Sequence, residues 1–182
     1  MKKLVLVTAI ASLSLAAAAL ADVVQAPKNQ GLYIGGNIGV VDPSTPYADV
    51  GVDAGLQLGY RFNKNFRAEL ASSIMSSQSV YTSDVDLNTV LLMTNGYFDI
   101  DMGSPVVPFV GAGIGYINEE IANSYTDLTA TESGLAYQGI VGLSFKLNSD
   151  LRLEFAYHYV ASTNDILFAQ NLFNIGLNYY FS

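Results

Sequence analysis

One histidine and no cysteine limit the chemistry that this chain can perform. His158 is the only histidine in 182 residues, and cysteine is absent. A hydrolytic triad needs a nucleophile, a base and an orienting acid, and a zinc site needs three or four nitrogen, sulfur or carboxylate ligands. A single histidine serves both sets poorly, so we expect no catalytic residue, no metal site and no cofactor. We interpret His158 as a hydrogen-bonding residue, with a pH switch as the alternative.

The glycines between Gly111 and Gly115 do not predict a phosphate site. The segment reads GAGIG, and neither a lysine nor a helical pattern follows it. Phosphate-binding loops need both, because the lysine and the helix N-terminus contact the phosphate. We expect these glycines to provide space where the chain is crowded.

Seven charged residues lie close to three short turn-forming segments at 63–65, 101–105 and 148–150. They combine four cations with three carboxylates, namely Arg61, Arg67, Lys146 and Arg152 with Glu69, Asp99 and Glu154. Opposite charges that are enclosed together are expected to form ion pairs, because an unpaired buried charge is costly. We predict a structural charge cluster that fills an interior. A gated path for ions is the alternative.

A second charged group is acidic throughout. The segments 42–50, 76–86, 118–134 and 162–168 contain no lysine or arginine. Their nine carboxylates are Asp42, Asp49, Asp84, Asp86, Glu119, Glu120, Asp127, Glu132 and Asp165. Solvation of exposed loops explains such residues, and binding of divalent cations or of a basic host partner is the alternative. No segment has EF-hand spacing, so a dedicated calcium site is not expected.

The first 21 residues form a separate segment. A basic start at Met1-Lys2-Lys3 precedes an apolar run over 4–18 and the small-residue sequence Ala19-Leu20-Ala21. This order is typical of a secretory signal peptide, so we expect cleavage after Ala21 and a linker over 22–30, with an uncleaved anchor as the alternative. Loss of Lys2 and Lys3 leaves 6 basic and 16 acidic residues, a net charge of −10. So acidic a chain is not expected to bind nucleic acid.

The elements that must position these residues are β-strands. Apolar and polar residues alternate with period two in eight runs separated by turn-rich gaps. The runs lie near 31–41, 51–62, 66–75, 87–100, 106–117, 135–147, 151–161 and 169–181. Consecutive strands joined by short gaps indicate an antiparallel meander. Because short gaps alternate with long ones, the pattern favours an outer-membrane barrel with short periplasmic turns and longer extracellular loops.

The two faces of these strands differ in size. In LRLEFAYHYV at 151–160, Leu, Phe and Tyr alternate with Arg152, Glu154 and His158, and other strands alternate bulky residues with Gly, Asn and charges. An eight-stranded barrel encloses only enough room for side chains to meet, so the bulky face must point outward, toward lipid. The run Leu91-Leu92-Met93 leaves one strand ambiguous. Outward aromatic residues near both strand ends predict two membrane-interface girdles.

With this architecture, one segment resembles a known family. The sequence PFVGAGIGY at 108–116, preceded by NGYFD at 95–99, is similar to small outer-membrane β-barrels of the opacity-type surface antigen and OmpA/OmpX-like, porin-like group. The resemblance covers 31–182. It implies an eight-stranded barrel in a Gram-negative outer membrane, the lipid bilayer and the barrel assembly machinery as partners, and exposed loops. Lipid A deacylase barrels carry a His-x-Ser motif, whereas this chain has His158-Tyr159-Val160.

The sequence therefore favours a non-enzymatic outer-membrane barrel that supports the envelope and presents acidic loops, as a surface antigen or adhesin does, to a host or surface ligand. A narrow porin-like channel or small-solute transporter is the alternative. A lipid-modifying enzyme lacks its nucleophile, and a soluble ligand-carrying barrel is a further alternative.

Overall fold

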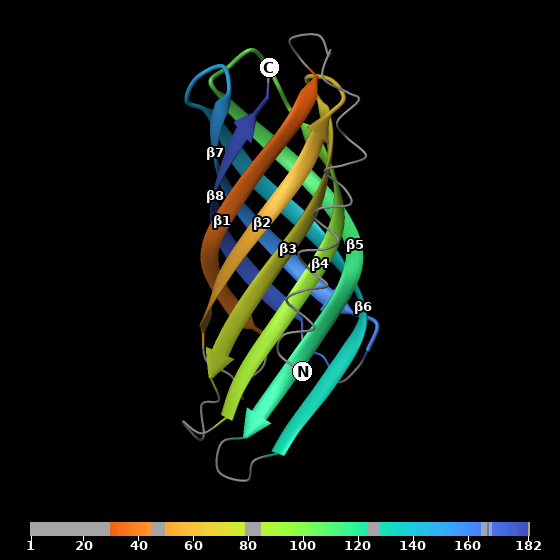
Figure 1. Ribbon diagram of the computed structural model, residues 1–182. Helices are drawn as coiled ribbons and strands as arrows, with labels where there is room; N and C mark the ends of the chain where they lie inside the picture. Colours follow the sequence, from red (N-terminus) through yellow and green to blue (C-terminus); the bar gives the residue numbers. More distant parts are fainter. Residues whose placement is uncertain are drawn as a thin grey trace.

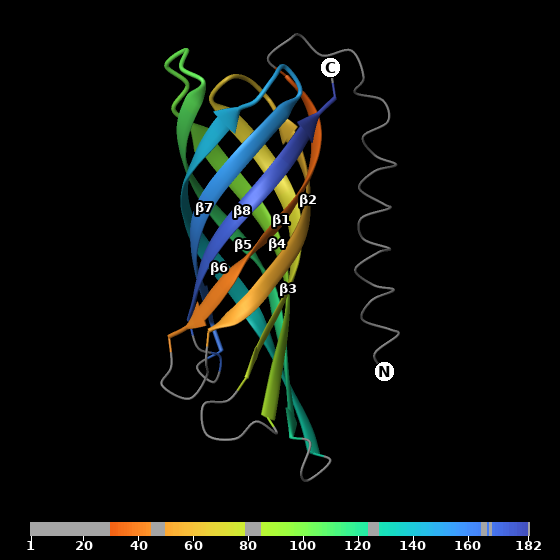
Figure 2. The same ribbon diagram turned by 90° about the vertical axis from the view of Figure 1, so that its left-hand side faces the viewer.

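The computed structural model describes residues 30–44, 50–78, 85–123, 128–164, 167 and 169–181. Eight strands form a closed antiparallel barrel in which each strand pairs with the next and β1 pairs with β8 (Figures 1 and 2). The strands are β1 (Gly31–Pro43), β2 (Gly51–Arg61), β3 (Phe66–Gln78), β4 (Val85–Asp99), β5 (Val106–Asn123), β6 (Leu128–Lys146), β7 (Leu151–Ser162) and β8 (Gln170–Tyr180). The predicted eight-stranded barrel is confirmed. The predicted signal peptide and nearly all of the linker lie outside the described residues.

Three short turns close one end of the barrel, at the top of Figures 1 and 2. Two of them depend on an asparagine that replaces missing backbone contacts. Asn63 Oδ1 accepts hydrogen bonds from the backbone N–H groups of Asn65 and Phe66, and Asn148 Oδ1 accepts them from Asp150 and Leu151. These bonds fix the chain reversals and therefore the register of the strands that follow.

Two strands extend far beyond their predicted bounds. β5 reaches Asn123 and β6 starts at Leu128, so most of the segment 118–134 is a strand hairpin that projects beyond its neighbours (Figures 1 and 2). The prediction of a loop at 118–134 was wrong, because Glu119, Glu120 and Glu132 lie in strands. The period-two apolar signal stops near residue 117 because a strand that has left the hydrocarbon needs no apolar outer face.

The bulky residues face outward as predicted. Ile38 is 69% exposed on the outer surface, whereas its inward neighbour Asn37 contacts other interior side chains. The ambiguous strand is resolved, because Leu91 and Met93 are buried inside the barrel and Leu92 is exposed outside. Within the described ranges, no helix has the length and apolar character needed to cross a membrane.

Glycines on the inner face allow large side chains to lie across the barrel. A Cβ atom at Gly59 would overlap the ring of Tyr33, and one at Gly111 would overlap the ring of Tyr97. The expectation that glycines of the GAGIG segment provide space is confirmed at Gly111. Both rings belong to the interior network that forms the candidate site.

Candidate functional site

An ion-pair network fills the barrel near the short turns. The Arg67 side chain is 0% exposed and lies between two carboxylates, with Nε 3.1 Å from Asp99 Oδ1 and Nη1 3.1 Å from Glu154 Oε1. Arg61 Nη2 lies 2.7 Å from Asp99 Oδ2. These four residues, from β2, β3, β4 and β7, are called the ion-pair layer below. Their mutual pairing allows full charges to exist in an enclosed space.

Aromatic rings surround the central guanidinium. Arg67 Cζ lies 4.2 Å from the ring centre of Tyr97 and 4.8 Å from that of Phe109. The two rings meet edge to face, with centres 5.8 Å apart. Cation–π contact stabilises the buried cation in addition to its carboxylates. The sequence analysis did not place these rings in the charge cluster, although the strand alternation puts both on the inner face.

Glu69 belongs to this region but is held by neutral groups. Its carboxylate accepts hydrogen bonds from Tyr33 Oη at 2.9 Å, Tyr97 Oη at 2.9 Å and Asn95 Nδ2 at 3.3 Å. Charge-assisted hydrogen bonds of this kind compensate a carboxylate for lost hydration. The hydrogen-bond partners of Glu69 are therefore two tyrosines and an amide, whereas the sequence analysis predicted a cluster of paired charges.

The two remaining cations of the predicted group lie apart from its carboxylates. Lys146 Nζ lies 2.8 Å from Asp101 Oδ2 in a short turn, and this hydrogen bond lowers the pKa of Asp101. Arg152 Cζ lies 4.9 Å from the ring centre of Tyr180. Neither cation forms an ion pair with Glu69, Asp99 or Glu154 among the described contacts. The structure thus divides the seven residues into the four-residue ion-pair layer, Glu69 with its tyrosine and amide partners, and two peripheral cations.

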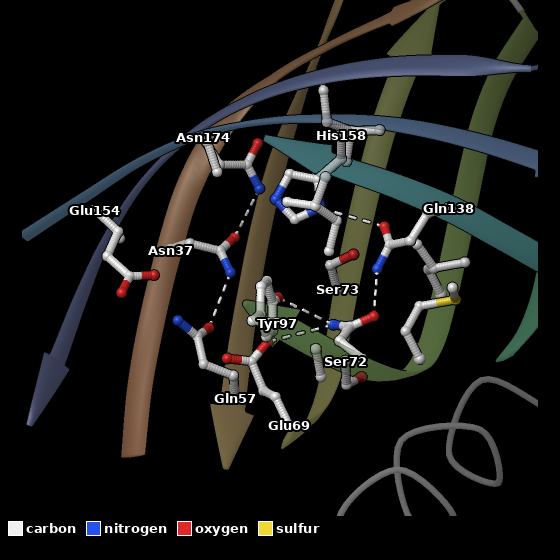
Figure 3. Close-up of a pocket in the computed structure, with 18 of the residues that line it drawn as sticks. Asn37, Gln57, Glu69, Ser72, Ser73, Tyr97, Gln138, Glu154, His158 and Asn174 are labelled. Carbon is white, nitrogen blue, oxygen red and sulfur yellow. Dashed lines mark hydrogen bonds between the residues drawn. The ribbon is translucent and has the colours of Figure 1, made fainter. Parts of the chain in front are cut away.

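Amide side chains continue the network along the wall formed by β1, β2 and β8. Gln57 Nε2 donates to Asn178 Oδ1, Asn37 Nδ2 donates to Gln57 Oε1, and both bonds are 2.9 Å long. Asn174 Nδ2 then donates to Asn37 Oδ1 at 3.1 Å and to Asp53 Oδ2 at 2.8 Å. Figure 3 shows the central part of this row.

A second row of hydrogen bonds links β6 and β7 to Glu69 (Figure 3). His158 Nδ1 lies 3.2 Å from Gln138 Oε1, and Gln138 Nε2 donates to Asn95 Oδ1 at 2.6 Å. Because an amide oxygen faces Nδ1, the proton belongs on that nitrogen. The hydrogen-bond partner of His158 is an amide, whereas a catalytic base would need an orienting acid.

A cavity of about 60 Å³ lies between the two rows. It is called the polar chamber below. Glu69, Tyr97 and Glu154 line it toward the short turns, and Leu91, Met93 and Leu172 line it toward the long loops. The chamber therefore separates the ion-pair layer from a second, apolar layer.

That second layer is called the apolar septum. It consists of buried side chains from seven of the eight strands and one loop residue, namely Val41, Met75, Leu91, Met93, Ile117, Ala136, Val160, Leu172 and Leu167. All are between 1% and 6% exposed. The sequence analysis described the interior as glycine, amides and charges. That description is wrong for the half of the barrel near the long loops.

The nine acidic positions do not form one cluster in the described residues. Asp42 is exposed near the end of β1, Glu119 is buried and accepts a hydrogen bond from Thr89 Oγ1 at 3.3 Å, and Glu132 accepts one from Asn164 Nδ2 at 3.5 Å. Glu120 is half-buried on β5, and Asp86 lies in β4. Asp49, Asp84, Asp127 and Asp165 lie outside the described residues. No metal-binding group of three or more His, Cys, Asp or Glu residues occurs in the described part of the chain.

An apolar outer wall around a filled polar and apolar interior defines a membrane-spanning β-barrel. The model of the outer membrane protein beta-barrel domain family matches residues 5–181. The chain belongs to this family, and its location is the outer membrane. The two layers and the chamber are therefore the interior of an outer-membrane barrel.

Comparison with individual proteins agrees with this assignment. A candidate adhesin of Rickettsia canadensis (strain McKiel) is 28% identical over 132 residues, which cover 61% of this chain. The match spans 58% of the length of that relative. Neisserial surface protein A has the same fold, with a TM-score of 0.67, 16% identity and coverage of 83% of this chain and 97% of that protein. Ail of Yersinia pestis gives a TM-score of 0.57, 15% identity and coverage of 84% and 98%.

Proposed function

We propose that this barrel is a non-enzymatic protein that contributes to envelope structure and presents an acidic surface for attachment, as a surface antigen or adhesin does. One observation carries the proposal: the interior is filled by two layers of side chains, whereas charge of a single sign collects at the long-loop end. At that end Asp42 is exposed and Glu120 and Glu132 are half-buried, whereas Glu119 is buried, and the described cations lie at the other end. The candidate adhesin among the relatives supports the same role.

The ion-pair layer is assigned a structural role in this proposal. Arg67 connects β3 to β4 through Asp99 and to β7 through Glu154. Strands on opposite sides of the barrel are thereby joined across its axis. Export with cleavage of residues 1–21 and insertion by the barrel assembly machinery belong to the proposal as well, on the strength of the signal-like sequence and the family resemblance.

The sign of the surface charge limits the kind of partner. An acidic surface attracts basic segments of a protein and repels polyanions. Ail was crystallised with the heparin analogue sucrose octasulfate, which is a polyanion. We infer that this barrel has a different preference and that a basic host or surface protein is the ligand.

Binding to charged surfaces tests this inference. The barrel, held in nanodiscs of zwitterionic lipid, is expected to bind immobilised poly-lysine, more weakly as salt rises, and not to bind heparin. The triple variant Asp42→Asn, Glu120→Gln, Glu132→Gln should lose most of this binding. Asp101→Asn, which changes a carboxylate at the opposite end, should retain it. Heparin binding by the native barrel, or unchanged binding by the triple variant, would contradict the proposed partner class.

Attachment itself needs a cellular assay. Bacteria without other adhesins that produce the native barrel should attach to cultured epithelial cells more than bacteria producing the triple variant, at equal surface amounts. Liposome swelling addresses the porin-like alternative, because a barrel with a filled interior should not admit small sugars. Swelling at rates typical of a porin would favour a transport function instead.

A further inference from the structure

The interior contains two closures of opposite chemistry with a chamber between them. The ion-pair layer closes the chamber toward the short turns, and the apolar septum closes it toward the long loops. Both are made of buried side chains, yet they exclude solutes for different physical reasons. The question is which of them keeps ions and polar molecules from entering the chamber from the cell exterior.

The septum takes side chains from every strand except β2, where the buried Asp53 pairs with Met75 and accepts a hydrogen bond from Asn174. Val41 on β1 pairs with Leu172 on β8, and Leu91 on β4 pairs with Ile117 on β5. Met75 on β3 and Val160 on β7 add buried side chains from further around the wall. The aliphatic and methionine side chains of the septum offer an entering ion nothing to replace its hydration shell. Such a layer blocks ions even when thermal motion opens a narrow path through it.

The chamber below the septum is suited to water. Its volume of about 60 Å³ has room for about two water molecules, each of which takes about 30 Å³ in the liquid. Amide, carboxylate and hydroxyl groups line it, and Asn174 Oδ1, in a residue only 8% exposed, has no hydrogen-bond partner among the described side chains. A buried polar atom of this kind is normally satisfied by an internal water. The chamber is too small for a sugar or a nucleotide.

We propose that the polar chamber is a sealed internal water site and that the apolar septum is the barrier that separates it from the cell exterior. This inference does not depend on the proposed adhesive role, because it concerns the interior and not the acidic surface. It makes a directional claim: weakening the septum exposes the chamber to the exterior only, while the ion-pair layer still closes the other side.

Thiol labelling tests this claim directly, because the native chain has no cysteine. Ser73→Cys introduces one thiol on the chamber wall. Intact cells of a strain without general porins are treated with a permanently charged trimethylammonium methanethiosulfonate reagent, which then reaches the barrel from outside. The thiol should react slowly in the otherwise native barrel. Adding Leu91→Ala and Met93→Ala should raise the labelling rate about tenfold or more, because the apolar barrier is thinned.

Matched controls separate the septum from general loosening of the barrel. Leu92→Ala changes the residue between the two septum positions but faces lipid, so it should leave the labelling rate unchanged. A folded barrel migrates faster on a gel before boiling than after it, and this difference confirms that each variant is folded. If the double variant Leu91→Ala, Met93→Ala fails to fold, the single change Leu172→Ala replaces it. Rapid labelling of Ser73→Cys in a barrel whose septum is unchanged would overturn the proposal. Slow labelling of Ser73→Cys in every folded variant with a weakened septum would overturn it as well.

Discussion

The two halves of the barrel interior differ in the kind of contact that holds their side chains together. Near the short turns, Arg67 contacts Asp99 and Glu154 through hydrogen bonds with fixed directions. Near the long loops, the septum is held by apolar contact alone, and two of its members are flexible methionines. Directional bonds specify one arrangement of the strands, whereas apolar contact excludes water and tolerates rearrangement. One layer fixes the barrel geometry and the other seals it.

Removing the central cation should have the largest effect. Arg67→Ala leaves Glu154 without its cation and Asp99 with Arg61 alone, so we expect a loss of about 3–5 kcal/mol in the free energy of unfolding. Equilibrium unfolding in urea, with the barrel in detergent micelles, measures this loss. Lys64→Ala, an exposed change in the adjacent turn, should cost less than about 0.5 kcal/mol. Equal stabilities for the two variants would show that the ion-pair layer does not hold the strands.

A pair of leucines sharpens the comparison for the apolar layer. Leu91→Ala should lower the free energy of unfolding by about 2–5 kcal/mol, because the septum closes only partly around the space left behind. Leu92→Ala should cost clearly less, since mobile acyl chains fill the space outside the barrel. The same urea titration compares the two variants. A larger loss for Leu92 would mean that lipid contact, and not septum packing, dominates this strand.

The sequence predicted the strands and their faces because both follow from a local period of two. It did not predict which inner residues meet, because this depends on the pairing register and the tilt of the strands. Asp99 meets Arg67 and Arg61, while Glu69 meets Tyr33 and Tyr97. A usable signal existed: the same alternation placed Tyr33 and Tyr180 inward, and it would have placed Leu91 and Met93 inward once Leu92 was set outward. The end of β5 was missed because its outer face turns polar beyond the membrane.

Arg152 provides a weaker test of the charged half. Its guanidinium stacks on Tyr180 without an ion pair among the described contacts, so Arg152→Ala should cost about 1 kcal/mol, less than Arg67→Ala. Neither Arg152→Ala nor Glu69→Ala should open a conductance, because the septum stays intact in both. Urea unfolding and planar-bilayer recordings measure the two quantities. A clear stepwise current from either variant would mean that the charged half, and not the septum, closes the barrel.

The smallest expected effect concerns the contact between Lys146 and Asp101, in the short turn at the end of the barrel that contains the ion-pair layer. The hydrogen bond from Lys146 lowers the pKa of Asp101 in the folded protein below its ordinary value. A carboxyl with a lowered folded pKa stabilises the fold above its unfolded pKa, and this contribution disappears as the pH falls through the folded value, below about pH 4. Both groups are partly exposed, so Asp101→Asn should cost less than about 1 kcal/mol at pH 7 and nothing at pH 2. Urea midpoints at the two pH values measure the difference. An equal loss at pH 2 would mean that Asp101 acts through the shape of its turn and not through its charge.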